Sequence, residues 1–170
     1  MRYRWLCTLA VIFLLPAAGM AQTSATEAGY AYATVEQVPI TLTLSNQMHF
    51  GVFSPWGQAG SVTVYATHAV PTEGTNVTIL SQGYPARWAV TGTPNAPFHL
   101  VLPADRTIAI NSTNDSMVID YFFSSYNETG TTPVLGSNGS VSFTTGAKLL
   151  VKANQTPGVY SGSFPVTVAY

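Results

Sequence analysis

Residues 158–170 constrain the fold more than any other part of this 170-residue chain. Their sequence, GVYSGSFPVTVAY, alternates between aromatic or branched residues and small or polar ones. A two-residue period is typical of a β-strand with one buried and one solvent-exposed face. We therefore expect a long closing strand built into a sheet. Pro165 lies on the polar side and lacks a backbone N–H, so we expect this strand at an edge or beside an unpaired position.

Shorter segments with strand-like patterns recur along the chain. Gly, Pro and Asn turn signals separate them, and no apolar period of 3.6 residues stands out beyond the N-terminal region. This pattern predicts an all-β fold, an antiparallel β-sandwich of the Ig-like or pilin-like kind, although a closed barrel fits the same pattern. The expected strands are residues 38–44, 61–66, 77–80, 86–92, 98–103, 107–111, 117–126, 141–143, 148–153 and 158–170.

The N-terminal region has the layout of a signal peptide. Arg2 and Arg4 precede an apolar run over residues 6–15, and Gly19-Met20-Ala21 supplies small residues for cleavage between Ala21 and Gln22. An uncleaved membrane anchor is the alternative. We expect a signal peptide over residues 1–21, a flexible leader over 22–33 and a single β-sandwich domain over 34–170. Cys7 is the one cysteine and lies inside the signal, so we expect no disulfide in the mature chain. We also expect no stable membrane span once the signal is cleaved.

The composition argues against several classes of protein. Charged residues make up 8% of the chain, far below the roughly 25% of an average soluble domain. Removing Arg2 and Arg4 from six basic residues leaves four, against seven acidic ones. A mildly acidic chain without a basic cluster lacks the electrostatic footprint of a nucleic-acid-binding protein, so we expect no such partner.

Three segments together resemble a known family. They are HFGVFSPWGQAGSVTV, PARWAVTGTPNAPFHLVLP and GAKLLVKANQTPGVYSGSFPVTVAY, and the resemblance covers about residues 34–170. This order resembles the secreted bacterial family called domain of unknown function 4402. The terminal motif matches in register at Gly158, Tyr160, Gly162, Phe164, Val166, Val168 and Tyr170. The resemblance implies export from a bacterial cell to the periplasm, the cell surface or the medium.

The layout is more distantly similar to the spore coat protein U domain and to the pilins of the chaperone–usher pathway. Those subunits are Ig-like sandwiches completed or polymerised by a donated N-terminal strand. This chain lacks the cysteine pair of the spore coat protein U pattern.

No set of residues points to catalysis, a metal or a cofactor. His49, His68 and His99 are far apart and have no partner at metal-ligand spacing. Asp105, Asp115 and Asp120 form no evident carboxylate pair across a cleft. A calcium site in the loop at residues 111–115 is an alternative, but the loop lacks alternating aspartates. We therefore expect a protein that is not an enzyme.

Aromatic residues are the other candidates for a binding site. Trp56, Tyr84 and Tyr126 are candidates for stacking on a sugar ring, while packing in the core is the alternative reading. Trp88, in the segment ARWAVTG, is typical of a buried sandwich tryptophan.

Two functions follow as hypotheses. The first is a structural or adhesive surface subunit that assembles by strand pairing, with other subunits or an assembly chaperone as partners. Its candidate donor strand is residues 31–44, with Val38, Ile40, Leu42 and Leu44 on one face, unless this segment pairs within its own domain. The second is a monomeric secreted or periplasmic module that binds carbohydrate or a surface polymer.

Overall fold

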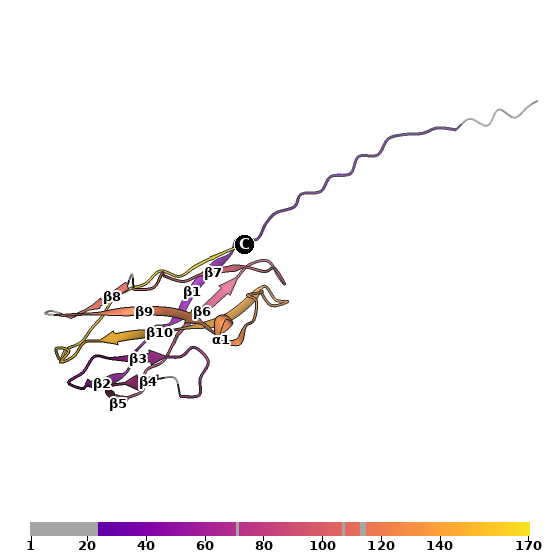
Figure 1. Ribbon diagram of the computed structural model, residues 1–170. Coiled ribbons are helices and arrows are strands. Elements are labelled where there is room, and N and C mark those ends of the chain that lie inside the picture. The colour runs from indigo at the N-terminus through magenta and orange to yellow at the C-terminus, as the bar shows by residue number, and fades with distance from the viewer. Residues whose placement is uncertain (1–23, 71, 107, 113–114) are drawn as a thin grey trace, which may run out of the picture. The chain divides into compact units, whose positions relative to one another are not determined.

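The computed structural model describes residues 24–70, 72–106, 108–112 and 115–170. Its regular structure is almost entirely antiparallel β-strand, which confirms the all-β class (Figure 1). A single short helix, α1 (Ser125–Thr129), occurs in these residues. The strands are β1 (Thr41–Asn46), β2 (Val52–Pro55), β3 (Gly60–Val64), β4 (Thr72–Thr75), β5 (Val77–Ser81), β6 (Ala86–Thr91), β7 (His99–Val101), β8 (Ile108–Asn111), β9 (Ser116–Ser124), β10 (Ser140–Val151) and β11 (Thr167–Ala169).

The long strand β10 organises the main sheet of seven strands. One edge of β10 pairs with β9, and the other edge pairs first with β6 and then with β3. The sheet continues from β6 to β1, from β3 to β4 and from β9 to β8. Figure 1 shows β10 between β9 and β3. Two smaller sheets, β2–β5 and β7–β11, complete the fold.

The two small sheets cover the inner face of the main sheet, and each creates a core cluster. One cluster joins buried residues of β3, β8, β9 and β10 to side chains of the β2–β5 sheet. The other joins β6 and β10 to the β7–β11 sheet. Val62, Val64, Val90 and Leu149 are fully buried, and burial of one such side chain contributes about 1.5–3 kcal/mol. With no cysteine after Cys7, this packing carries the stability.

A bulge in β9 reverses which face its side chains occupy. Leu149 pairs with Ile119 but Lys148 pairs with Tyr121, so Asp120 is an extra residue in β9. Ile119 is 2% exposed and faces the core, whereas Tyr121 is 39% exposed on the opposite face. Ile119 and Tyr121 have the same parity in the sequence but lie on opposite faces, because the bulge shifts the alternation by one residue.

The closing strand is shorter than expected. Only β11 is a regular strand within residues 158–170, together with a single bridge between Ser161 and Asn111. The alternation still decides which side chains turn inward, because Phe164, Val166 and Val168 pack on the core while Pro165 and Thr167 are exposed. Pro165 lies outside the ladder, as expected of a residue without an N–H.

Other strand boundaries also differ from expectation. The segments expected at 141–143 and 148–153 are one continuous strand, β10, because Gly146 adopts an ordinary strand conformation within it. The sequence pattern missed the short strands β2 and β4. The strand expected at 117–126 ends at Ser124, where the Ser124 side chain accepts a hydrogen bond from the Asn127 N–H and begins α1.

Residues 36–170 form one compact unit. Residues 24–35 belong to a separate unit, contain no helix or strand and are exposed. The expected signal peptide and its cleavage site at Ala21 and Gln22 lie outside the described residues. Within the described part of the chain, no helix is long and apolar enough to cross a membrane.

Candidate functional site

Aromatic rings cross the outer face of the main sheet in a row. Phe123 of β9 pairs with Gly146 of β10, and Tyr65, which follows β3, lies on the other side of Gly146. The ring centroids of Tyr65 and Phe123 are 5.9 Å apart, with the planes tilted by 44°. A Cβ atom on residue 146 would lie 2.6 Å from Cε2 of Phe123. The same Cβ atom would lie 2.2 Å from the Val64 carbonyl oxygen, so the backbone of β3 as well as the Phe123 ring requires glycine at this position.

Two more rings extend the row. Tyr121 lies 5.8 Å from Phe123 with a tilt of 47°, and His68 stacks on Tyr65 at 3.9 Å. Together they bound a surface depression of about 320 Å³, which we call the aromatic depression. Its floor and sides are Tyr65, His68, Tyr121 and Phe123, and Asn127 and Glu128 complete its lining. Concave, mostly aromatic surfaces with a few polar groups are typical of small-ligand sites.

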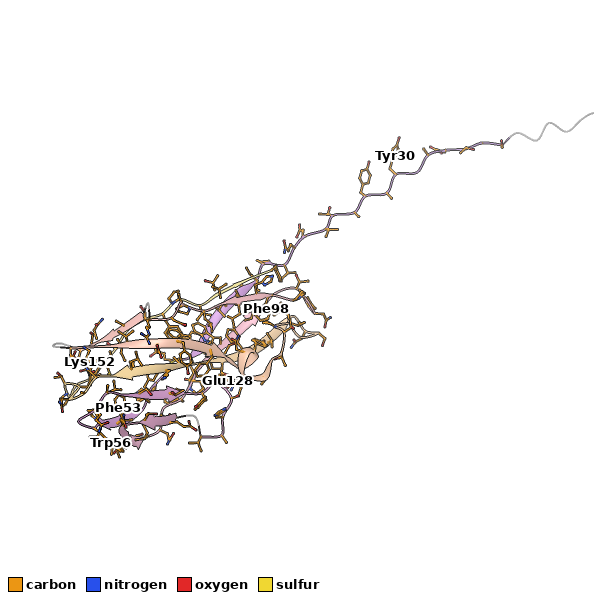
Figure 2. All side chains as sticks on the ribbon, in the orientation of Figure 1. Tyr30, Phe53, Trp56, Phe98, Glu128 and Lys152 are labelled. Carbon is orange, nitrogen blue, oxygen red and sulfur yellow. The ribbon has the colours of Figure 1, made fainter. Side chains whose placement is uncertain are left out.

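The short helix α1 holds the polar part of the lining in place. The side chains of Ser124 and Asn127 form a reciprocal cap at its start. One carboxylate oxygen of Glu128 accepts a hydrogen bond from the Ala66 N–H over 3.0 Å, and the other accepts from the Thr67 hydroxyl. These bonds fix Glu128 between α1 and the segment after β3. Figure 2 shows Glu128 on the short helix α1.

The charges around the aromatic depression are mainly negative. The Tyr65 hydroxyl donates to Glu73 over 2.9 Å. This bond, then burial and the charges of Glu73 and Glu128, raise the pKa of Tyr65, because each disfavours the phenolate. Lys148 is a cation beside the row of rings, with its Nζ 5.7 Å from the centre of the Tyr121 ring. Lys148 also lies 3.6 Å from Asp120, whose pKa is lowered chiefly by its hydrogen bond with Arg106.

Some polar atoms of the lining remain available to a ligand. Within the described part of the chain, the side-chain amide nitrogen of Asn127, the Tyr121 hydroxyl and the ring nitrogens of His68 have no hydrogen-bond partner. The Glu128 oxygens each have further acceptor capacity. The aromatic depression therefore combines apolar ring surfaces with unpaired donors and acceptors.

The residues that the sequence suggested for sugar stacking do not come together. Trp56 is 53% exposed beside β2, and its indole N–H donates to Thr78 of β5 (Figure 2). Tyr84 is 46% exposed and stacks on His49. Among the described residues, no ring contact joins Trp56, Tyr84 and Tyr126 to one another. They do not form a shared platform.

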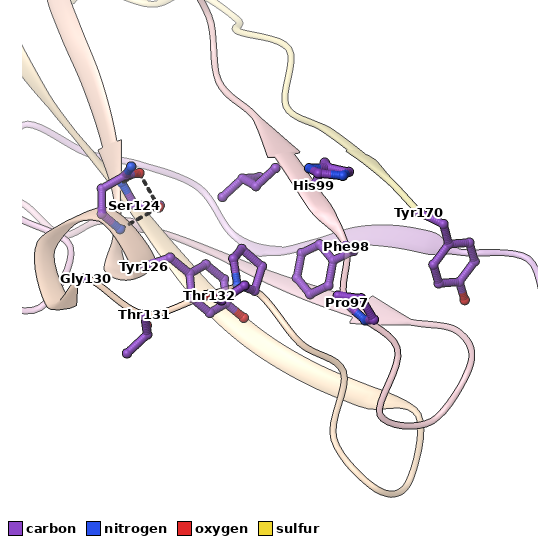
Figure 3. Close-up of a pocket in the computed structure, with 12 residues that line it drawn as sticks. Pro97, Phe98, His99, Ser124, Tyr126, Gly130, Thr131, Thr132 and Tyr170 are labelled. Atoms are coloured by element: carbon purple, nitrogen blue, oxygen red, sulfur yellow. Dashed lines mark hydrogen bonds between the residues drawn. The ribbon is translucent and has the colours of Figure 1, made fainter.

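Tyr126 instead packs in the second core cluster. Its ring contacts Phe98 edge-on at 6.0 Å and Phe143 at 5.7 Å. It also lines a cavity of about 550 Å³ with Phe98, Thr132 and Tyr170 (Figure 3). The Tyr126 hydroxyl is buried and has no partner among the described residues, and burial raises the pKa of Tyr126. Tyr126 therefore packs in the core, which was the alternative to a role in sugar stacking.

The candidate donor strand pairs within its own domain. β1 runs antiparallel to β6, with Leu42 opposite Val90 and Leu44 opposite Trp88. Ile40 and Leu42 pack against the second core cluster, while Leu44 is 44% exposed. Val38 precedes the strand, and its carbonyl accepts a hydrogen bond from the Tyr170 hydroxyl.

The terminal motif divides between packing and surface positions. Phe164, Val166 and Val168 pack on the second cluster, and Tyr160 packs on the first. Gly158 and Gly162 are exposed. A Cβ atom on residue 162 would lie 2.8 Å from the Ala109 carbonyl oxygen, so glycine is needed there for a close backbone approach.

The titratable groups do not gather into a metal site. Among the described residues, no group of three His, Cys, Asp or Glu side chains has the geometry to hold an ion. Asp115 from the candidate calcium loop accepts instead from Lys152 Nζ at 2.8 Å and from Gln155 Nε2 at 2.6 Å. These hydrogen bonds connect the loop at Asp115 to the segment that follows β10.

Comparison with known proteins identifies the family. A family model matches residues 40–170, which include every strand described above. The chain belongs to the family described as Domain of unknown function (DUF4402). No curated protein and no solved structure matches the chain. The DUF4402 match confirms the resemblance drawn from the terminal motif.

The sequence did contain a signal for the aromatic depression. Residues 117–126 are apolar on both parities around residues 121–123, which is typical of a central strand. β9 is indeed paired on both edges, with β8 and β10. The second apolar face, however, is not covered by another layer, because the Asp120 bulge turns Tyr121 and Phe123 to the exposed side. A bulge cannot be seen in the alternation alone.

Proposed function

We propose that this DUF4402 protein is an exported, non-enzymatic surface protein that binds carbohydrate at the aromatic depression. The observation that carries the proposal is the row of Tyr121, Phe123 and Tyr65 across the outer face of the sheet. Side chains on that face are not required to fill the core, yet rings gather there around a concave surface. Partly exposed aromatic side chains around a concave surface are a common feature of ligand sites.

The chemistry of the lining supports a sugar as the ligand. A pyranose ring has an apolar C–H face and a rim of hydroxyl groups. The ring faces of Phe123 and its neighbours complement the apolar face, since aromatic side chains offer large rigid contact areas. The Asn127 amide and the Glu128 carboxylate complement hydroxyl groups. A nucleic acid base also stacks on rings, but its phosphates would meet Glu73 and Glu128.

A glycan array probed with the mature protein, residues 22–170, tests this proposal. We expect retention on a defined subset of glycans, lost in Phe123→Leu and retained in the matched control Trp56→Leu, which removes an exposed ring elsewhere. A protein that binds no glycan on the array, or a Phe123→Leu variant with the unchanged pattern, would contradict the proposal. Circular dichroism of both variants checks that the fold is intact.

Assembly by strand pairing is a second candidate, favoured by one observation. β1 is the terminal strand of the main sheet, and among the described residues its only strand partner is β6. Most of β1 is exposed, with Leu42 alone half-buried. An edge strand with few buried side chains is a template for another chain. The pairing seen within the domain nevertheless means that assembly through residues 31–44 requires β1 to leave β6.

A disulfide lock tests assembly by exchange of β1 and leaves the free edge of β1 and the aromatic depression unchanged. The hydroxyls of Thr41 and Thr91 lie 2.6 Å apart on adjacent strands, so Thr41→Cys with Thr91→Cys places two thiols at bridging distance. Size-exclusion chromatography and electron microscopy of the mature protein then give the answer. Assembly by β1 exchange predicts fibres or ladders that disappear in the oxidised variant and return on reduction. A monomer that ignores an added peptide of residues 31–44 excludes this candidate.

A further inference from the structure

We propose that the glycan bound at the aromatic depression carries free amino groups, so that a protonated amine binds between the rings and Glu128. This inference rests on the proposed function and adds the chemical class of the ligand. It starts from the geometry of the rings. Tyr65 and Tyr121 both contact Phe123, with their ring planes tilted against it by 44° and 47°. The three rings line one depression, and the negative π-face of an aromatic ring attracts a cation.

The charges of the lining favour a cation over an anion. Glu128 is the one charged side chain that lines the aromatic depression, and its carboxylate is held in place by Ala66 and Thr67. Glu73 adds a second carboxylate next to Tyr65. Lys148 is outside the lining and faces Asp120. A ligand amine in the depression therefore meets the Glu128 carboxylate, and the charge of Glu73 nearby also favours a cation over a ligand carboxylate or phosphate.

One ring of the row already binds a cation. Lys148 Nζ lies 5.7 Å from the centre of the Tyr121 ring, within the range of a cation–π contact. The same surface therefore stabilises an ammonium group within the protein. A second ammonium, from the ligand, would occupy the opposite side of the depression, next to Phe123, Tyr65 and Glu128.

A primary amine fits this site better than a quaternary one. A quaternary ammonium donates no hydrogen bond, and is best enclosed by rings alone. A primary ammonium has three N–H donors, and the Glu128 oxygens retain acceptor capacity for them. An amino sugar supplies both the ammonium and the apolar ring face that the proposed function requires.

The test compares two oligosaccharides that differ only in the amine. We expect the mature protein to bind the β-1,4-linked glucosamine tetramer about tenfold more tightly than its N-acetylated counterpart in calorimetric titrations below the amine pKa. Added salt should weaken the binding of the charged tetramer and leave the neutral one unchanged. Glu128→Gln should remove the tenfold preference. Glu36→Gln, which makes the same charge change at an exposed residue outside the depression, should keep it.

The outcomes distinguish this inference from the proposed function. Equal or tighter binding of the N-acetylated tetramer would overturn the inference that the site recognises an amine. The proposal of a site for neutral glycans would remain. No binding of either tetramer, together with an empty glycan array, overturns both. Tighter binding to phosphatidylcholine vesicles than to the glucosamine tetramer would contradict a glycan ligand and indicate a lipid headgroup. His68→Ala provides a variant on an exposed loop that should weaken binding without disturbing β9.

Discussion

The Tyr170 hydroxyl joins β11 to the start of β1. It donates a hydrogen bond to the Val38 carbonyl over 3.0 Å and accepts one from the Thr93 N–H over 2.5 Å. The close approach requires glycine at position 92, where a Cβ atom would lie 2.2 Å from the Tyr170 oxygen. One phenol thus connects three segments that are far apart in the sequence. It holds the first residues of the domain beside the terminal motif.

Replacing Tyr170 with Phe should destabilise the domain. The change removes two hydrogen bonds, each of which contributes about 0.5–1.5 kcal/mol, so we expect a loss of roughly 1–3 kcal/mol in the free energy of unfolding. Urea denaturation measures it. Tyr84→Phe is the matched control, because the Tyr84 hydroxyl has no hydrogen-bond partner among the described residues. Equal stability of both variants would show that the Tyr170 bonds contribute nothing.

Acid should destabilise the protein through Asp115. Hydrogen bonds from Lys152, then from the Ser116 and Thr156 N–H groups, lower the pKa of Asp115 from 3.8 to about 2. Because the folded-state pKa is the lower one, the stabilisation is fully present above pH 3.8 and is lost as the pH falls through about 2. Unfolding measured from pH 6 to pH 2 should therefore show a slope that Asp115→Asn flattens. An unchanged slope in that variant would contradict the assignment.

Thr145→Val should be strongly destabilising although it preserves volume. The indole N–H of Trp88 donates to the Thr145 hydroxyl over 3.0 Å, and both residues are buried. Valine leaves that N–H unpaired in the core, at a cost of about 1–3 kcal/mol. Thr63→Val on the outer face of β3 should cost much less, because the Thr63 hydroxyl has no partner among the described residues. Equilibrium unfolding of the two variants tests the difference.

Tyr126→Phe should stabilise the protein, in contrast to the substitutions at Tyr170 and Thr145. The buried Tyr126 hydroxyl has no partner, so removing it relieves a desolvation cost and should raise the free energy of unfolding by about 1 kcal/mol. Tyr160→Phe is the contrast, because the Tyr160 hydroxyl donates to the Thr156 carbonyl at 2.6 Å and accepts from Gln155 at 3.0 Å. If Tyr126→Phe lowers stability as Tyr160→Phe does, the hydroxyl has a partner in solution.

Local patterns predicted the fold class and the inward face of most strands. Val62 and Val64 are buried, as the alternation in residues 61–66 indicated, and Phe164, Val166 and Val168 turn inward as expected. The pattern overestimated the last strand, because alternation reports which face is buried and not whether the backbone is paired. The pattern also predicted two strands where the structure has the single strand β10. Gly146 lies between the two, and a glycine resembles the end of a strand when the ring that packs against it is not known.

The candidate site required tertiary information. Tyr65, Gly146 and Phe123 are separated by many residues and become neighbours only through the pairing of β3, β10 and β9. The Asp120 bulge then decides that Tyr121 and Phe123 face outward. The sequence instead favoured Trp56, Tyr84 and Tyr126, because residue type alone does not distinguish an exposed aromatic side chain from one in the core. Only the register distinguishes them.

Mapping a bound glycan onto the protein tests the central claim most directly. In a ¹H–¹⁵N and aromatic ¹H–¹³C NMR titration of the mature protein with the β-1,4-linked glucosamine tetramer, the account predicts saturable shifts at Tyr65, His68, Tyr121 and Phe123. The signals of Trp56 and Tyr84 should stay in place. Shifts confined to Trp56 or Tyr84 would contradict a glycan site on the outer face of β3, β9 and β10. No saturable shift at any of these rings, with this tetramer or with its N-acetylated counterpart, would contradict it as well.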